Sequence, residues 1–119
     1  MIAFLSRLFR DRPEKPAWIS ASDLQRRLTN GLVLLVDVRQ SEEFTAPPGH
    51  LPGAINVPLG DLASRTHDLA ACGQPIVLVC KTDRRSARAA AELLAAGLRD
   101  VAVLRGGTDG WHARGLALE

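Results

Sequence analysis

The sequence has few aromatic residues and no strong excess of charge of either sign. Its 119 residues include two Trp, three Phe and no Tyr, and the formal net charge is +2. Proteins that bind single-stranded nucleic acids use aromatic stacking and strongly basic surfaces, so this composition does not favour that class. With 46% hydrophobic and 24% charged residues, the chain has the composition of one globular domain with a real core.

Cysteine is also scarce, because only Cys72 and Cys80 are present. The segment from Pro75 to Cys80 is expected to be extended, and it then spans roughly 16 Å at about 3.3 Å per residue. A disulfide requires Cα atoms within about 7 Å of each other. We therefore expect two free thiols, a reducing compartment and a cytoplasmic location.

The sequence shows no spacing that is typical of a metal site. The three histidines are scattered, and no pair of closely spaced cysteines accompanies them. His67 and His112 are therefore assigned to the surface. We expect neither a metal ion nor an organic cofactor.

No hydrophobic run approaches the ~20 residues that a membrane-spanning helix requires. Residues 1–16 are interpreted as an N-terminal extension, set off by prolines from a domain at residues 17–119. The first apolar run ends at Leu5. No positive region precedes it and no small-residue cleavage site follows it, so a signal peptide is not expected.

The extension nevertheless has an amphipathic pattern. On a helix, Ile2, Leu5, Leu8 and Phe9 would share one face, and the arginines would lie outside it. Two interpretations stay open: a poorly ordered or loosely docked extension, or a helix that binds a membrane surface or a partner protein.

In the rest of the chain, apolar strands alternate with helical patterns. The expected strands are residues 18–19, 32–36, 54–57, 76–79 and 101–104, and the expected helices are residues 22–30, 41–45, 59–69, 85–96 and 108–111. Continuous apolar runs are typical of strands covered on both faces. The pattern predicts an α/β fold with a parallel sheet and helices on both faces.

Three residues are expected to cap these helices. Ser22 and Gln25 have the spacing of a capping box, Gly31 follows the end of the same helix, and Thr108 is predicted to cap the last helix. In parallel sheets, functional sites form outside the carboxyl ends of the strands. Asp37 and Cys80 stand at two such ends.

The loop after Val79 combines a cysteine with charged side chains. It reads Cys80, Lys81, Thr82, Asp83, Arg84, Arg85 and Ser86. The N–H groups of this loop and of the first helical turn have no helical partners, so they can form an anion-binding nest beside the positive end of the helix dipole. Such a setting favours a thiolate, which makes Cys80 the candidate nucleophile. Cys72 lacks all of these features and is interpreted as structural.

Four segments of the chain resemble conserved elements of a known family. They are VDVR at 36–39 with EF at 43–44, GHLPGAINVP at 49–58, CKTDRRS at 80–86, and LRGG at 104–107 with Trp111 and Gly115 after it. Together and in this order they are highly specific, and they resemble the single-domain rhodanese-like sulfurtransferases from about Trp18 to the C-terminus.

The resemblance implies a sheet of about five parallel strands between helices. It also implies a reaction in which Cys80 takes the outer sulfur of a donor such as thiosulfate and becomes a persulfide. The sulfur then passes to an acceptor, which is cyanide or a thiol, or to a partner protein in a sulfur relay. By the same resemblance, Arg85 should close the loop and the amides of residues 81–85 should face the sulfur.

One residue of the loop departs from the family pattern, because many relatives have glycine at the position of Asp83. Asp tolerates left-handed backbone better than most residues, so we expect the loop shape to survive. A carboxylate here would oppose a thiolate unless it pointed outward, and Arg84 or Lys81 is its expected partner. Donor preference is the property most affected by this change.

Two other functions are weighed against the sulfurtransferase. A cysteine phosphatase or arsenate reductase uses a C-x5-R loop, whereas here the arginine follows Cys80 after four residues and leaves less room for a tetrahedral phosphate. A non-catalytic binding or sulfur-carrier module is the second alternative. The intact cysteine argues against an inactive domain, but it does not separate a free-standing enzyme from a relay component.

Four further residues are candidates for the edge of the site, each with a simpler alternative. Asp37 and Arg39 could form an ion pair that fixes the strand end, or could line the pocket rim. Glu43 could lie at the rim or merely solvate a helix. His50 is expected to hydrogen bond within its Pro- and Gly-rich loop rather than to transfer protons. Trp111 is assigned to the core.

Overall fold

The fold is built on one five-stranded sheet. A computed structural model describes residues 15–119, and in it the strand order is β1-β5-β4-β2-β3, with every pair of neighbours parallel. The strands are β1 (Ala17–Ile19), β2 (Leu34–Asp37), β3 (Ile55–Asn56), β4 (Ile76–Val79) and β5 (Val101–Leu104). The parallel sheet predicted from the alternating apolar and helical segments is confirmed.

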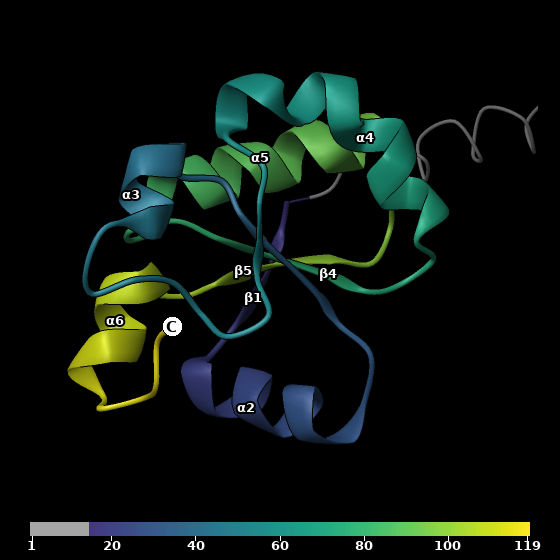
Figure 1. Ribbon diagram of the computed structural model, residues 1–119. Coiled ribbons are helices and arrows are strands. Elements are labelled where there is room, and N and C mark those ends of the chain that lie inside the picture. Colours follow the sequence, from purple (N-terminus) through teal and green to yellow (C-terminus); the bar gives the residue numbers. More distant parts are fainter. Residues whose placement is uncertain (1–14) are drawn as a thin grey trace, which may run out of the picture.

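Helices cover both faces of this sheet, as expected. They are α2 (Ala21–Asn30), α3 (Ser41–Thr45), the 3-10 turn η1 (Leu59–Asp61), α4 (Leu62–Ala71), α5 (Arg84–Ala95) and α6 (Gly107–Ala113). Figure 1 shows α4 and α5 above the sheet and α2 and α6 below it. Each pair of helices has its own hydrophobic cluster against the strands.

The two-residue period of β4 decides which cluster receives Cys80. Ile76 and Leu78 point into the cluster under α4 and α5, whereas Val77 and Val79 point into the other one. Cys80 continues the first row and belongs to the cluster on the α5 side.

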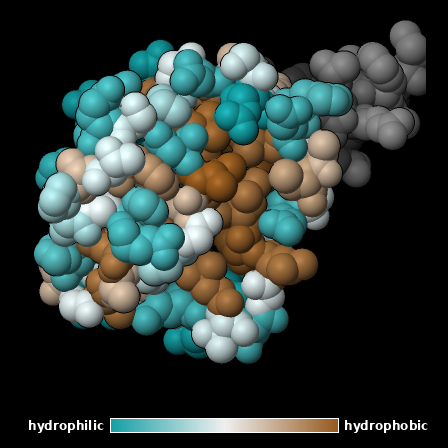
Figure 2. Space-filling view, in the orientation of Figure 1, coloured by the Kyte–Doolittle hydropathy of each residue, from teal (hydrophilic) through white to brown (hydrophobic). Residues whose placement is uncertain are grey.

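The space-filling view in Figure 2 shows apolar side chains gathered in a band across one face, between more polar areas.

The predicted elements are present, with boundary shifts of a few residues and two wrong caps. The cap of α2 is Ser20, whose hydroxyl accepts a hydrogen bond from the N–H of Asp23, rather than Ser22. The cap of α6 is Gly106 in a left-handed conformation, rather than Thr108, which lies inside the helix and is buried. Both errors have one cause. In each case the helix begins earlier than predicted, and a residue two positions before the predicted cap takes the cap position.

The prediction about the N-terminal extension falls, apart from its last two residues, outside the described part of the chain. Within residues 15–119, no helix is long and apolar enough to cross a membrane.

Candidate active site at the carboxyl end of the sheet

The sheet brings the two predicted strand-end residues together. Asp37 ends β2 and pairs in register with Val79, the last residue of β4, and Cys80 follows directly. Both side chains are almost fully buried, with 1% of each residue exposed. The prediction that Asp37 and Cys80 stand at carboxyl ends of strands is confirmed, and the structure adds that these two strands are neighbours.

Cys80 lies at the bottom of a hollow of about 560 Å³ rather than on an open surface. Leu59 and Thr82 line this hollow with four cationic side chains, Lys81, Arg84, Arg85 and Arg88. The thiol is reduced and unpaired, as expected. A ligand therefore reaches the sulfur through a basic entrance.

The loop above the thiol leaves a run of backbone donors without acceptors. Between Lys81 and Ser86, no backbone N–H donates a hydrogen bond to any described residue; the first that does is the N–H of Ala87, to the carbonyl oxygen of Asp83. This matches the expectation for a strand end followed at once by the first turn of α5. Six neighbouring donors and the positive end of a 12-residue helix favour a bound anion here.

Ser86 connects the thiol to this loop. Its Oγ lies 3.2 Å from Cys80 Sγ and donates to the carbonyl oxygen of Asp83 at 3.1 Å. The side chain is buried at the start of α5. Because a hydroxyl can both donate and accept, Ser86 can interact with the sulfur in either protonation state.

Arg85 is held by an acid from another helix. Its guanidinium donates to both carboxylate oxygens of Glu43, at 2.6 and 3.0 Å, and Figure 1 shows α3 beside the first turn of α5. The hydrogen bond from Arg85 lowers the pKa of Glu43 to about 2, and the bond from the Gln40 N–H acts in the same direction against the effect of burial. The same pairing raises the pKa of Arg85. Glu43 is therefore bound to a residue of the cysteine loop and is not only a solvated helix residue.

Asp37 and Arg39 form the expected ion pair, and Arg39 also lines a hollow beside the cysteine loop. Arg39 Nη2 lies 2.8 Å from Asp37 Oδ2 and also donates to the carbonyl oxygen of Gly49 at 3.0 Å. Arg39 further lines a second hollow of about 260 Å³, together with Glu43, Lys81 and His112. The ion pair weighed for these residues is thus present, and Arg39, but not Asp37, also lines a hollow.

His50 is tied to its own loop, as expected. Its Nδ1 lies 2.9 Å from the carbonyl oxygen of Phe44, its ring stacks on the Phe44 ring at 3.7 Å, and its Nε2 lies 3.6 Å from Glu119 Oε2. It lines neither hollow near the cysteine. We assign it a role in holding the loop that follows α3.

The expectations for Asp83 were wrong in two respects. Its φ is −132°, so the position makes no demand for left-handed backbone. Its carboxylate accepts a hydrogen bond from the N–H of Gly106 at 2.8 Å and pairs with neither Arg84 nor Lys81. Lys81 pairs instead with Asp109, at 2.7 Å.

Sequence reasoning missed that the turn at Gly106 and Gly107 holds the cysteine loop in place. The N–H of Thr108 donates to the carbonyl oxygen of Cys80 at 2.9 Å, and the N–H of Asp109 donates to that of Lys81 at 3.0 Å. A Cβ on Gly107 would lie 2.3 Å from the Cys80 carbonyl oxygen, and its φ is +59°. Only glycine fits there. The Gly-Gly pair was a visible signal, but its contact partner was not.

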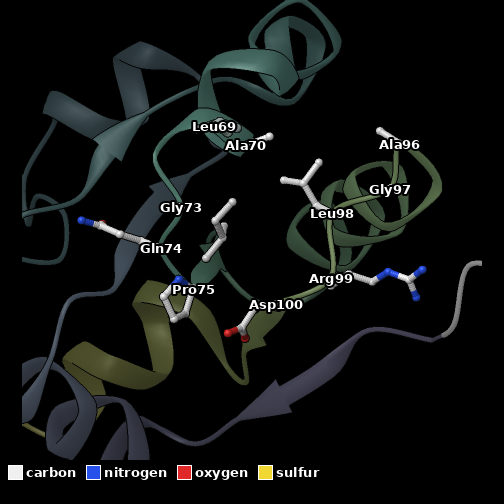
Figure 3. Close-up of a pocket in the computed structure, with 11 residues that line it drawn as sticks. Leu69, Ala70, Gly73, Gln74, Pro75, Ala96, Gly97, Leu98, Arg99 and Asp100 are labelled. Atoms are coloured by element: carbon white, nitrogen blue, oxygen red, sulfur yellow. The ribbon is translucent and has the colours of Figure 1, made fainter.

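A further hollow of about 390 Å³ lies away from this site. It is lined by the ends of α4 and α5 and the segments leading into β4 and β5, including Leu69, Pro75, Ile76 and Leu98 (Figure 3). Because the sheet is parallel, these strand starts lie at the edge opposite Cys80. Cys72 is exposed at the C-terminal end of α4 and does not line the hollow that contains Cys80.

The described residues include no group of three or more potential metal ligands. The features near Cys80 are instead a buried thiol, free backbone donors and a basic entrance. Comparison with known proteins points to a family of the same kind. Residues 20–114 match the family described as Rhodanese-like domain. The chain belongs to the rhodanese-like family.

Named relatives support this assignment. A protein named Sulfurtransferase from Allochromatium vinosum is 32% identical over 101 residues, which cover 84% of this chain and 92% of that protein. The crystal structure of a thiosulfate sulfurtransferase from Pseudomonas aeruginosa superposes with a TM-score of 0.77 at 31% identity, covering 87% of this chain and 20% of that one. The human single-domain sulfurtransferase TSTD1 gives 0.70 at 25% identity, covering 82% and 96%.

Several rhodanese-like relatives are much longer than the region they share with this chain. The chain spans 26% of the transcriptional regulator Rv0324 of Mycobacterium tuberculosis and 61% of the Bacillus subtilis protein YqhL. The rhodanese-like unit thus occurs in proteins of different size and name.

Proposed function

We propose that this protein is a sulfurtransferase that carries a sulfane sulfur on Cys80 as a persulfide. The observation that supports it most directly is the position of the thiol, at the bottom of a basic hollow and next to a loop whose six backbone N–H groups have no acceptor among residues 15–119. Donors and products of sulfur transfer are anionic, and this arrangement stabilises negative charge where it would develop.

The first step is attack on the donor. The Cys80 thiolate, having released its proton to solvent, attacks the outer sulfur of thiosulfate and forms a new S–S bond. The bond from that sulfur to the sulfonate sulfur breaks, and sulfite leaves with the electron pair. The negative charge on the persulfide and on sulfite is then stabilised by the loop amides and the cationic side chains.

The hydrogen bond between Ser86 and Cys80 can reverse its direction when the sulfur becomes negatively charged. When Cys80 is a thiol, its S–H donates to Ser86 Oγ while the hydroxyl donates to the Asp83 carbonyl oxygen. When Cys80 is a thiolate, the hydroxyl rotates and donates to the sulfur instead. Both distances are already short enough for either arrangement, so no backbone movement is required.

The second step returns the enzyme to its resting state. An acceptor thiolate or cyanide attacks the outer sulfur of the persulfide. The S–S bond to Cys80 breaks, its electron pair returns to Cys80 as thiolate, and the sulfur leaves on the acceptor. Neither step requires a metal ion or an oxidant, because the sulfane sulfur moves as one unit between two nucleophiles.

Intact mass spectrometry after incubation with thiosulfate tests this function. A gain of about 32 Da, one sulfur atom, located on Cys80 and removed by a thiol is the expected result. An unchanged mass for a protein whose Cys80 is reduced and alkylates readily would contradict the proposal. Incubation with p-nitrophenyl phosphate in parallel tests phosphatase activity, for which the loop is one residue too short.

A second candidate is a sulfur carrier that receives its persulfide from a partner and passes it on. It is favoured by a Bacillus subtilis protein named Putative sulfur carrier protein YrkF, 31% identical over 80 residues, which cover 67% of this chain and 42% of that protein. A carrier would accept sulfur from a persulfidated protein donor but not from thiosulfate. The same mass measurement with both donors separates the two functions.

A further inference from the structure

Two arginines on α5 stand at the entrance of the Cys80 hollow. Arg84 is the first residue of the helix and Arg88 follows one turn later, and both are exposed and line the same hollow of about 560 Å³ as the thiol. Residues four apart on a helix lie on one face. Together they form a pair of guanidinium groups beside the access path to the sulfur.

The other cations at this entrance are balanced by nearby acids. Lys81 lies 2.7 Å from Asp109, and Arg85 is held by both oxygens of Glu43. These two pairs leave little free charge for a ligand.

Arg84 and Arg88 have no comparable balance. The Arg84 side chain makes no ion pair or hydrogen bond with any other described residue. Arg88 approaches Glu92 at only 3.8 Å, with 74% of the arginine side chain exposed. Like charges one turn apart destabilise a helix, so contacts within the described chain do not account for this pair.

One turn of α5 separates the two arginines of this pair. With a rise of about 1.5 Å per residue, Arg88 lies about 6 Å further along α5 than Arg84. A ligand longer than thiosulfate is therefore better suited to contact Arg88 while its sulfur is at Cys80. A ligand that reaches both must carry an anionic group several bonds away from its sulfur.

We propose that Arg84 and Arg88 form a subsite for a carboxylate of the sulfur acceptor, a small thiol whose carboxylate lies several bonds from its sulfur. A planar guanidinium matches a carboxylate by two parallel hydrogen bonds. The hollow's volume is within the range of small-molecule pockets, which favours a small acceptor over an acidic protein surface. The subsite rests on the proposed sulfurtransferase function and specifies its acceptor.

In the transfer, the subsite holds the acceptor while its thiolate attacks the outer sulfur of the Cys80 persulfide. The S–S bond to Cys80 breaks and Cys80 leaves as thiolate, so the acceptor departs as a persulfide. The carboxylate takes no part in bond making. It raises the local concentration and fixes the orientation of the acceptor.

The test compares two acceptors that differ only in their carboxylates. The Cys80 persulfide is formed with thiosulfate, excess donor is removed, and its discharge is timed with glutathione and with glutathione diethyl ester. The measured quantity is the ratio of the two second-order rate constants. Variants Arg84→Gln, Arg88→Gln and the double variant are compared with Arg26→Gln, an exposed arginine on α2, across the sheet from α5.

The expected result is a fall in the glutathione-to-ester ratio by about fivefold for each single variant and about tenfold or more for the double variant. The ratio should keep its wild-type value in Arg26→Gln, and added salt should lower it in the wild type. An unchanged ratio in the double variant overturns the subsite, as does an equal fall in Arg26→Gln.

Failure of the subsite and failure of the proposed function give different results. If no persulfide forms with thiosulfate or with a persulfide donor, the sulfurtransferase function itself is wrong. A different result leaves the function standing and overturns only the subsite. In that case the persulfide forms, both glutathione and its ester discharge it, and the ratio of their rate constants is the same in the wild type and in the arginine variants. Discharge only by an acidic protein acceptor, and by neither small thiol, also overturns the proposed small acceptor.

Discussion

At the scale of single residues, three side chains of the cysteine loop have defined partners. Ser86 lies next to Cys80 Sγ, Asp83 accepts from the Gly106 N–H, and Arg85 is paired with Glu43. These partners come from different segments of the chain. The loop therefore keeps its shape before any ligand binds, which is the condition for stabilising charge without reorganisation.

The two cysteines should differ sharply in function. Cys80→Ser is expected to lower the rate of thiosulfate-dependent sulfur transfer by about 10³-fold or more, because it removes the nucleophile. Cys72→Ser should retain most of the rate, since Cys72 is exposed and its thiol contacts only the Asp68 carbonyl oxygen at 3.5 Å. A transfer assay on both purified variants measures this. Comparable losses would implicate both cysteines in catalysis.

The Asp83 carboxylate should matter as a hydrogen-bond acceptor more than as a charge. Asp83→Ala leaves the Gly106 N–H without its partner, and we expect a loss of about 1–2 kcal/mol in the free energy of unfolding and slower persulfide formation. Asp83→Asn keeps an acceptor oxygen and should retain most of both. Urea titration and the pH profile of persulfide formation measure the two effects. Equal behaviour of Asn and Ala would contradict this account.

At the scale of elements, the site depends on contacts between segments that are distant in sequence. Helix α3 supplies Glu43 to α5, and the first turn of α6 supports the loop after β4. None of these contacts involves the long apolar strands. The sheet places the segments, and a few polar contacts between them determine the local geometry.

The start of α6 should not tolerate a side chain at Gly107. Gly107→Ala requires left-handed backbone and puts a methyl group against the Cys80 carbonyl, so we expect a loss of about 2–4 kcal/mol in the free energy of unfolding. Gly110→Ala in the same helix is the control, because its Cβ meets nothing closer than 3.9 Å and alanine favours helix. Chemical denaturation of both variants decides the matter. Equal stability would show that the loop and turn can separate at little cost.

The contact between α3 and α5 should depend on acid. The pKa of Glu43 is about 2 in the folded protein against an ordinary 4.5, because Arg85 stabilises its charged form. Its contribution to stability is therefore complete above pH 4.5 and is lost as the pH falls from 4.5 toward about 2. Solvent screens this half-buried pair, so the effect should be about 1 kcal/mol or less.

Glu43→Gln should remove this acid-dependent contribution, and urea unfolding at a series of pH values measures it. Glu42→Gln on the same helix is the matched control, since Glu42 makes only a 3.4 Å contact with Ser41 Oγ. If the two variants lose stability on acidification in the same way as the wild type, the Glu43–Arg85 pair does not contribute to it.

At the scale of the whole molecule, stability comes from two apolar clusters, one on each face of the sheet. No disulfide connects them, because both cysteines are free thiols. Adding a reductant should therefore leave the thermal midpoint of unfolding unchanged in freshly purified protein. A fall in the midpoint on reduction, measured by circular dichroism, would reveal a bond between Cys72 and Cys80 that the fold does not accommodate.

Most of the fold could be predicted because its signals are local. Continuous apolar runs and intervening helical patterns indicated five strands and the helices between them, and their order implied a parallel sheet. The errors fell at helix starts, where Ser20 and Gly106 act as caps in place of Ser22 and Thr108. Which residue caps a helix depends on its backbone dihedral angles. Neighbouring residues and tertiary contacts determine those angles, so the residue type alone does not identify the cap.

By itself, the sequence determined the sheet, the family, the free thiols and the position of Cys80 at a strand end, because each depends on residue type and on neighbours close along the chain. Only the tertiary structure decided that the Asp83 carboxylate accepts a hydrogen bond from the Gly106 N–H. It also decided that Glu43 pairs with Arg85, which leaves the Arg84 and Arg88 side chains available to a ligand. Those pairings join segments from about 20 to more than 40 residues apart. Several partners of suitable charge compete for each side chain, and only the packed sheet determines which of them lies within reach.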